Sequence, residues 1–362
     1  MKVLKDIQSE ARNLATVFEK TGAEVVDPDF LQISNVLLDL YGEDIRGRAF
    51  ITNDSVYGEI MLRPDFTIPI VQQHMEKSVS SARYTYCGKV FRRQEEFPDR
   101  PREFLQVGYE IFDGANPEKA DAEVFSLVNE ALNGIPVRIA TGDIGILMAA
   151  VRSLSTTETR KKALLRHIWR PHRFRALLNQ FSGLSSKSQP NQNFEDYNKL
   201  LDKCQIIGSR NVREIKERLQ QIKLETETDP IDPEEVKILD ELISLKGGCT
   251  PALSHLEKIS KKMPGIELTV DNFAKRLSYL QKNGTNVDLL DFEGSYGRTS
   301  MEYYDGFVFG FYSETRIEFA PVATGGRYDA LTERMGQGKK IPAVGAVLRP
   351  DLTLLLRETY RD

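Results

Sequence analysis

Cysteine is scarce in this sequence, and long apolar runs are missing. Three cysteines occur among 362 residues, and they lack the C-x-x-C spacing of zinc and redox sites. A disulfide framework is therefore excluded, and reduced thiols in a cytoplasm are the simplest interpretation. The N-terminus has no apolar segment like that of a signal peptide, and no apolar run approaches the ~20 residues of a membrane span. We expect a cytoplasmic protein that does not cross a membrane.

Motifs of common enzyme chemistries are missing as well. The sequence has no G-x-x-x-x-G-K-[ST] phosphate loop, no H-E-x-x-H metal motif and no G-x-S-x-G nucleophile motif. Histidine is rare, and no pair of histidines has the spacing of metal ligands. We expect structural or surface roles, and no metal or cofactor, for the four histidines His74, His167, His172 and His255.

The charge balance bears on the choice of binding partner. The formal net charge is −4, with 40% hydrophobic and 28% charged residues, as in ordinary soluble globular chains. A negative net charge argues against an extended nucleic-acid surface. The segment 160–175 is a local basic exception that could bind a polyanion or dock a partner, although its pattern favours a solvated helix face. Its cations are Arg160, Lys161, Lys162, Arg166, Arg170, Arg173 and Arg175.

The hydrophobic pattern divides the chain into three parts. Residues 1–145 and 286–362 carry strand patterns, whereas residues 146–285 carry charged helical patterns and are expected to form a mainly helical insertion. Strands are predicted over 60–62, 84–91, 104–112, 137–141, 306–311, 316–320 and 343–348. Helices are predicted over 3–18, 120–132, 330–335 and 351–358, and further helix starts are marked by Asn116-Pro117 and Asp232-Pro233.

The strand predicted over 104–112 has two different faces. Period two places Leu105, Val107, Tyr109 and Ile111 on one side, and Gln106, Gly108 and Glu110 on the other. The second side could line a polar cavity. The pattern by itself favours the plainer interpretation, in which this polar side faces water.

Charged residues gather around the connection between the two strands predicted over 84–91 and 104–112. Four arginines lie there, and the planar guanidinium fork suits carboxylate or phosphate. Asp65, Glu110 and Glu302 are carboxylates on or beside predicted strands. A site with both signs could hold a zwitterion such as an amino acid, and surface ion pairing remains the alternative. The four arginines are Arg92, Arg93, Arg100 and Arg102.

Four segments in order resemble histidyl-tRNA synthetases. The sequence at 62–67, L-R-P-D-F-T, is similar to the family's L-R-P-E-x-T element, and residues 91–110 resemble its class II motif 2. Residues 302–309, E-Y-Y-D-G-F-V-F, are similar to its histidine-specific tyrosine element. Residues 325–329, G-G-R-Y-D, match the element before motif 3. The resemblance implies an α+β, class II aminoacyl-tRNA synthetase catalytic-domain fold, with an antiparallel sheet flanked by helices and a helical insertion.

Departures from that family's pattern fall on the side that binds ATP. The catalytic arginine before the two tyrosines is replaced by Thr299, with Arg298 one residue out of register. Gln94 stands for the motif 2 glutamate and Leu352 for the motif 3 arginine, and we expect no anticodon-binding domain after motif 3. Because adenylate formation develops charge on a phosphate, losing positioned cations removes transition-state stabilisation. These departures resemble the regulatory subunits of ATP phosphoribosyltransferase.

That second resemblance implies a non-catalytic protein of histidine biosynthesis. It would form a homodimer within a hetero-oligomer containing the short-form catalytic subunit, activate that subunit, and transmit feedback inhibition by histidine. The alternatives are an active histidyl-tRNA synthetase-like enzyme and a tRNA- or protein-binding module that uses the stretch 160–175. The remnant histidine pocket implied by position comprises Asp65, Thr67, Arg92, Arg102, Gln106, Glu110, Tyr303 and Tyr304.

Overall fold

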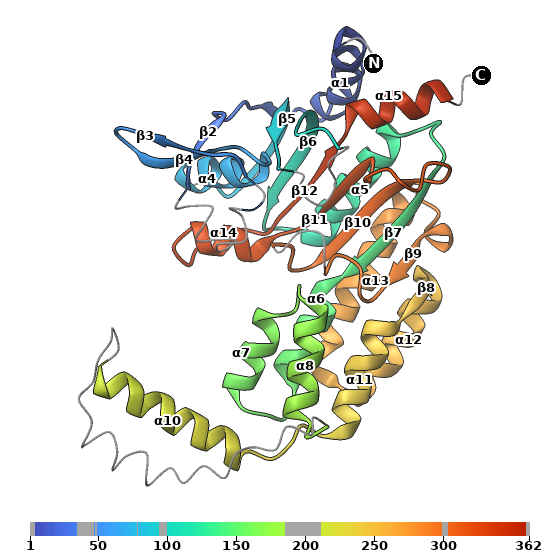
Figure 1. Ribbon diagram of the computed structural model, residues 1–362. Helices are drawn as coiled ribbons and strands as arrows, with labels where there is room; N and C mark the ends of the chain where they lie inside the picture. Colours follow the sequence, from blue (N-terminus) through green and yellow to red (C-terminus); the bar gives the residue numbers. More distant parts are fainter. Residues whose placement is uncertain are drawn as a thin grey trace.

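The fold is seen in a computed structural model that describes residues 4–34, 47, 49–77, 79–93, 100–184, 211–298 and 303–359. A large twisted sheet forms its centre, with helices on both faces and a helical region at one end (Figure 1). The helices are α1 Leu4–Glu19, α4 Thr67–Lys77, α5 Pro117–Ala131, α6 Ile144–Ser153, α7 Glu158–Arg166, α8 Pro171–Phe181, α10 Val212–Glu227, α11 Pro233–Ser244, α12 Cys249–Lys262, α13 Glu267–Lys282, α14 Asp329–Met335 and α15 Pro350–Thr359.

The central sheet has nine strands in the order β1-β5-β6-β12-β11-β10-β7-β9-β8. Every neighbouring pair is antiparallel except β1–β5 and β7–β9. Its strands are β1 Glu24–Val25, β5 Ser81–Phe91, β6 Glu103–Asp113, β7 Val137–Asp143, β8 Lys246–Gly248, β9 Asp291–Glu293, β10 Phe307–Ser313, β11 Ala323–Arg327 and β12 Ala343–Leu348. The predicted α+β class with an antiparallel sheet is confirmed.

A smaller sheet lies beside strand β5 of the large sheet. Its order is β2-β4-β3, formed by Leu31–Ile33, Gly58–Leu62 and Ile51–Asp54, and its three strands are antiparallel. Fully buried Arg63, at the end of β4, lies over the rings of Phe30 and Phe66 and donates from Nε to the carbonyl of Lys89 in β5. This arginine, two residues before Asp65, therefore fixes the small sheet against the large one.

Caps and buried ion pairs hold the helices in place. Asn116 accepts from the backbone N–H of Lys119 and starts α5, as predicted. The guanidinium of Arg276 in α13 bridges Asp121 of α5 and Asp143 at the end of β7, with both N–O distances 2.9 Å. Arg327 of β11 also binds Asp121, at 2.6 Å. This buried network joins the helical region to the sheet that carries the site.

The helical region follows β7 in the chain and consists mainly of α6–α8 and α10–α13 (Figure 1). Two short 3-10 turns, Pro264–Ile266 and Val287–Leu289, interrupt it. Strand β8 returns from this region and pairs with β9 at the sheet edge. The predicted mainly helical character thus includes one strand that the sequence pattern did not reveal.

One predicted strand is wrong. Residues 316–320 form a turn. The next strand after β10 in the chain is β11, which contains the G-G-R segment and pairs with β10. The hydroxyl of Ser313 accepts the backbone N–H groups of Thr315 and Arg316, which ends β10 and turns the chain. Ile317 is 88% exposed, so the apolar residue that suggested a strand contributes nothing to the core.

Candidate functional site

The polar face of β6 points into the protein. Gln106 and Glu110 are 2% and 1% exposed, so the interpretation that this side faces water is wrong. Strands β5 and β12 flank β6 in the sheet, and side chains from distant parts of the chain cover the polar face. A period-two pattern records which residues share a face, but it carries no information about what packs on that face.

Glu110 is the centre of a buried hydroxyl cluster. Its Oε1 accepts from the hydroxyl of Thr67 at 2.9 Å and from that of Tyr86 at 3.2 Å, while Oε2 accepts from the hydroxyl of Tyr328 at 2.6 Å. Burial raises the pKa of the Glu110 carboxyl to about 7, and the nearby charge of Asp65 acts in the same direction. Glu110 therefore titrates near neutral pH even though its hydroxyl donors favour the charged form.

Two glycines make room for this cluster. A Cβ at Gly345 of β12 would overlap the carboxylate of Glu110, and a Cβ at Gly108 would overlap the ring of Tyr86. Both positions pair across the sheet with the strands that carry these side chains, since Gly345 lies opposite Glu110 and Gly108 opposite Tyr86. The lack of side chains at these two positions therefore leaves room for the carboxylate of Glu110 and the ring of Tyr86.

A cavity of about 250 Å³ lies on the same side of the sheet. This volume is below the ~300–1,000 Å³ typical of sites for drug-sized ligands, so it suits a small molecule. The side-chain oxygen Oε1 of Gln106 is buried there and has no hydrogen-bond partner in the part of the chain that the structure describes. A lining residue with an unsatisfied acceptor indicates a ligand donor. The other polar lining residues are Arg92, Arg100, Tyr296, Tyr304, Thr324 and Arg349.

The arginines around this cavity have different roles. Arg92 donates from Nε to the carbonyl of Pro64 at 2.7 Å, which holds it beside Asp65. Arg349 lies over the ring of Phe104 and pairs with Asp351 through two hydrogen bonds, so its charge is matched within the chain. Arg102 is exposed and does not line the cavity, contrary to the predicted set. Arg100 takes its place at the cavity wall.

The remaining predicted residues lie around the cluster. Tyr304 is buried and lines the cavity, and its ring packs edge-on against that of half-buried Tyr303. Tyr303 also contacts the ring of Tyr328. Asp65 is buried at the start of α4, where its carboxylate accepts from the N–H of Ile68 at 3.4 Å. The structure thus brings together seven of the eight predicted residues, which are Asp65, Thr67, Arg92, Gln106, Glu110, Tyr303 and Tyr304.

Sequence reasoning missed two tyrosines that complete the cluster. Tyr328 lies within the G-G-R-Y-D segment, so a recognised motif contains this residue of the cluster. Tyr86 lies in β5, where Tyr84 and Tyr86 occupy the same side of a predicted strand. Nothing in that pattern distinguishes a tyrosine that donates to a carboxylate from one that only packs.

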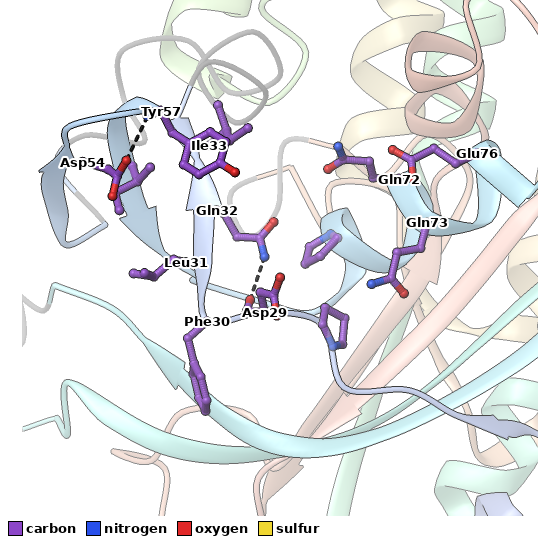
Figure 2. Close-up of a pocket in the computed structure, with 13 residues that line it drawn as sticks. Asp29, Phe30, Leu31, Gln32, Ile33, Asp54, Tyr57, Gln72, Gln73 and Glu76 are labelled. Atoms are coloured by element: carbon purple, nitrogen blue, oxygen red, sulfur yellow. Dashed lines mark hydrogen bonds between the residues drawn. The ribbon is translucent and has the colours of Figure 1, made fainter.

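A second cavity, of about 680 Å³, lies between the small sheet and α4. Figure 2 shows Leu31 and Ile33 of β2 and the preceding Phe30 on one side, and Gln72 and Glu76 of α4 on the other. The side chains of Phe30, Leu31 and Ile33 are about half exposed, and Tyr57 at the β3–β4 turn is more so. These partly exposed apolar side chains line the cavity together with polar side chains of α4.

The comparisons with known proteins agree with this geometry. The family model described as histidyl-tRNA synthetase matches residues 3–188 and 193–352. The chain belongs to the histidyl-tRNA synthetase family.

Among its curated relatives in that family are ATP phosphoribosyltransferase regulatory subunits. The one from Rhizobium rhizogenes is 27% identical, with 95% of this chain and 96% of the relative covered. The one from Rhizobium etli is 29% identical, with 92% and 94% covered. The likeness therefore extends over almost the whole of both proteins and is not confined to the motifs.

Solved structures support the same fold. A Bacillus halodurans ATP phosphoribosyltransferase regulatory subunit/histidyl-tRNA synthetase has a TM-score of 0.66 at 21% identity, covering 97% of this chain and 79% of that one. A histidyl-tRNA synthetase from Nostoc has a TM-score of 0.63 at 17% identity, covering 98% and 72%. At these identities the likeness is one of fold, and it confirms the class II synthetase architecture.

Within this synthetase fold, the departures on the ATP side can be placed in part. Gln94 and Thr299 lie outside the described residues. Leu352 lies in α15, so an aliphatic side chain occupies the motif 3 position. Arg298 is buried away from the cavity, where its Nε donates to the carbonyl of Ile168 at 2.8 Å and its guanidinium lies over the ring of Phe174. The arginine next to the catalytic position is therefore committed to the helical region.

Proposed function

We propose that this chain is the non-catalytic regulatory subunit of ATP phosphoribosyltransferase and binds histidine in the cavity beside Gln106. The end-to-end likeness to relatives that bear the name of that regulatory subunit carries the proposal. In this role the chain performs no reaction itself. It activates the short-form catalytic subunit in the first step of histidine biosynthesis and transmits feedback inhibition by histidine.

The distribution of charge supports a regulator over an active synthetase. Forming an aminoacyl-adenylate requires cations that are positioned on a phosphate before the reaction begins. Arg298 is held by a backbone carbonyl of the helical region, and Arg349 is paired with Asp351. The acidic and hydroxyl side of the site is intact by contrast, because Glu110 keeps all three of its donors. Such a site can hold an amino acid without activating it.

The buried groups suggest how histidine is held. The unpaired Oε1 of Gln106 accepts a hydrogen bond from the ligand ammonium, and Asp65 and Glu110 supply the negative charge that a cationic group needs. Arg92 and Arg100 line the same cavity and bind the ligand carboxylate. In this arrangement each end of a zwitterion meets a group of opposite charge.

We also propose that two copies of this chain pair inside a cytoplasmic hetero-oligomer. The apolar surface around Phe30, Leu31, Ile33 and Tyr57 supports this pairing, since exposed apolar side chains gain most from being covered. Among the described residues, no helix is both long and apolar enough to cross a membrane. Sedimentation of the Leu31→Glu/Ile33→Glu variant tests the pairing: a monomer is expected, and an unchanged dimer would contradict it.

Reconstitution with the short-form catalytic subunit tests the regulatory role. Phosphoribosyl-ATP formation is measured with the catalytic subunit alone and with increasing amounts of this chain. A rise in turnover that saturates, together with co-elution of the two proteins, is expected. An unchanged rate without co-elution refutes the proposal, and histidine-dependent exchange of pyrophosphate into ATP by this chain alone establishes a synthetase instead.

A further inference from the structure

A dense island of positive charge lies on the two short helices α7 and α8. Residues 158–175 contain seven lysines and arginines and one acidic residue, although the chain as a whole carries a net charge of −4. Lys162, Arg166, Arg170 and Arg173 are exposed, and they are named here the basic face. So much charge of one sign in an acidic protein creates a local field that attracts an anionic partner.

Arg160 is excluded from this face, which corrects the interpretation of the whole segment as solvated. It is 5% exposed, and its Nε binds the carboxylate of Glu225 at 2.7 Å. Its other nitrogens donate to backbone carbonyls at the end of α10, including those of Asp229 and Thr228. Arg160 is therefore a structural clamp, and the charge available to a partner lies further along the segment.

Three of the exposed arginines, Arg166, Arg170 and Arg173, lie on either side of His167 in the chain. Burial lowers the pKa of His167, and the charges of Arg173, Arg170 and Arg166 lower it further. Three guanidinium groups thus act on a single imidazole at the junction of α7 and α8. Their mutual repulsion is relieved when a partner contributes negative charge.

The surroundings favour a protein partner over a nucleic acid. Arg175, next to the basic face, is paired with Asp240, and α11 carries the further acids Glu234 and Glu241 on its surface. A nucleic-acid strand needs a continuous basic track for its phosphates, and these acids interrupt such a track. A compact basic patch with an acidic border suits an acidic patch on a folded protein.

The junction of α7 and α8 also touches the cavity wall. The indole N–H of Trp169 donates to the carbonyl of Tyr304 at 3.3 Å, and Tyr304 lines the cavity. On the other side, Nε of Arg298 donates to the carbonyl of Ile168. Arg170 of the basic face is therefore adjacent in sequence to Trp169, which contacts a residue that lines the proposed histidine site.

We propose that the basic face docks an acidic surface of the ATP phosphoribosyltransferase catalytic subunit. This proposal rests on the proposed function. It identifies the surface through which the chain acts on the catalytic subunit. It accounts for the exposed cations Lys162, Arg166 and Arg173, none of which lines the cavity. It also places the partner beside the segment that a bound histidine contacts.

A charge-reversal pair tests the docking. The Lys162→Glu/Arg166→Glu/Arg173→Glu variant reverses the basic face. Its control, Lys258→Glu/Lys261→Glu/Lys262→Glu, makes the same charge change at three exposed lysines of α12. The association rate constant with the catalytic subunit is measured from low to physiological salt, with circular dichroism and thermal melts as checks of folding.

Wild-type association is expected to slow as salt rises. The basic-face variant should associate about tenfold more slowly at low salt and lose most of its salt dependence. The control should stay within about twofold of wild type, because screened charges distant from an interface act weakly. Saturating concentrations of the basic-face variant should restore activated turnover, since the variant impairs docking only.

Each remaining outcome contradicts a different statement. Equal slowing in both variants overturns the basic face as the docking site while leaving the regulatory role intact. A wild-type chain that neither binds nor activates the catalytic subunit refutes the proposed function. Salt-sensitive tRNA binding that only the basic-face variant loses, with subunit association unchanged, would assign this face to nucleic acid instead.

Discussion

Replacing Gln106 by methionine separates a ligand-binding role from a structural one. The side chain is 2% exposed, and its Oε1 has no partner among the described residues. Leaving such a buried group unsatisfied costs about 1–3 kcal/mol in the free protein. Methionine has a similar length and no such acceptor, so Gln106→Met should raise the free energy of unfolding by about 1 kcal/mol.

Histidine affinity should fall in Gln106→Met, although the free energy of unfolding rises. In the complex, Oε1 of Gln106 accepts from the ligand ammonium, and a hydrogen bond to a charged group contributes about 1.5–3 kcal/mol. Its loss corresponds to a roughly 10- to 150-fold higher Kd. A variant that is more stable and binds more weakly is difficult to explain by general damage to the fold.

Urea denaturation and isothermal titration calorimetry measure the two quantities on the same preparation. Gln281→Met, at an exposed position of α13, is the control and should alter neither stability nor affinity. Unchanged histidine affinity in Gln106→Met would remove this residue from the pocket. A parallel loss of stability and affinity would show that Gln106 supports the fold, and the reasoning from its unpaired oxygen would be wrong.

Four further predictions concern the buried polar groups and their surroundings. Glu110→Gln and Asp65→Asn should each weaken histidine binding in calorimetry, and unchanged affinity in both removes them from the pocket. Because the pKa of Glu110 is raised from 4.5 to about 7, its stabilising contribution is complete below pH 4.5 and is lost as the pH rises towards 7. Urea titrations at several pH values should therefore show a smaller fall in stability over this window for Glu110→Gln than for wild type. Gly345→Ala should displace the Glu110 carboxylate and reduce histidine affinity about tenfold or more, since a Cβ there overlaps it; wild-type affinity would mean that the cluster lies outside the binding site. Arg276→Met should lower the free energy of unfolding by about 3–5 kcal/mol, because two buried aspartates lose their cation; a loss below 1 kcal/mol in urea denaturation would contradict this role of the network.

Local signals predicted most of the fold. Period-two runs and the charged connection between them predicted the β5–β6 hairpin, and cap residues predicted the starts of α5 and α11. These features depend on neighbours a few residues apart, which a sequence displays directly. The false strand over 316–320 shows where this fails, because the hydroxyl of Ser313 accepts from the backbone of Thr315 and Arg316 and turns the chain where the apolar pattern suggests a new strand.

The surroundings of the site residues could not be predicted in the same way. Glu110 receives hydroxyls from Thr67 and Tyr328, which are 43 and 218 residues away in the chain. Only tertiary packing decides whether a polar strand face meets water or such donors. The choice between Arg100 and Arg102 was equally inaccessible, since a loop has no period that assigns its side chains to one face.

Among the described residues, the junction of α7 and α8 connects the two proposed sites, and its strength limits the regulation that this junction can transmit. Trp169 binds the carbonyl of Tyr304 on one side of the junction, and Arg298 binds the carbonyl of Ile168 on the other. Two hydrogen bonds of about 0.5–1.5 kcal/mol each give a coupling free energy of at most about 3 kcal/mol. That limit corresponds to a change in affinity of no more than about 150-fold. Because coupling between binding sites is reciprocal, whatever factor histidine applies to the affinity of the catalytic subunit, that subunit must apply to histidine. The same limit therefore applies to both directions of the coupling that this junction transmits.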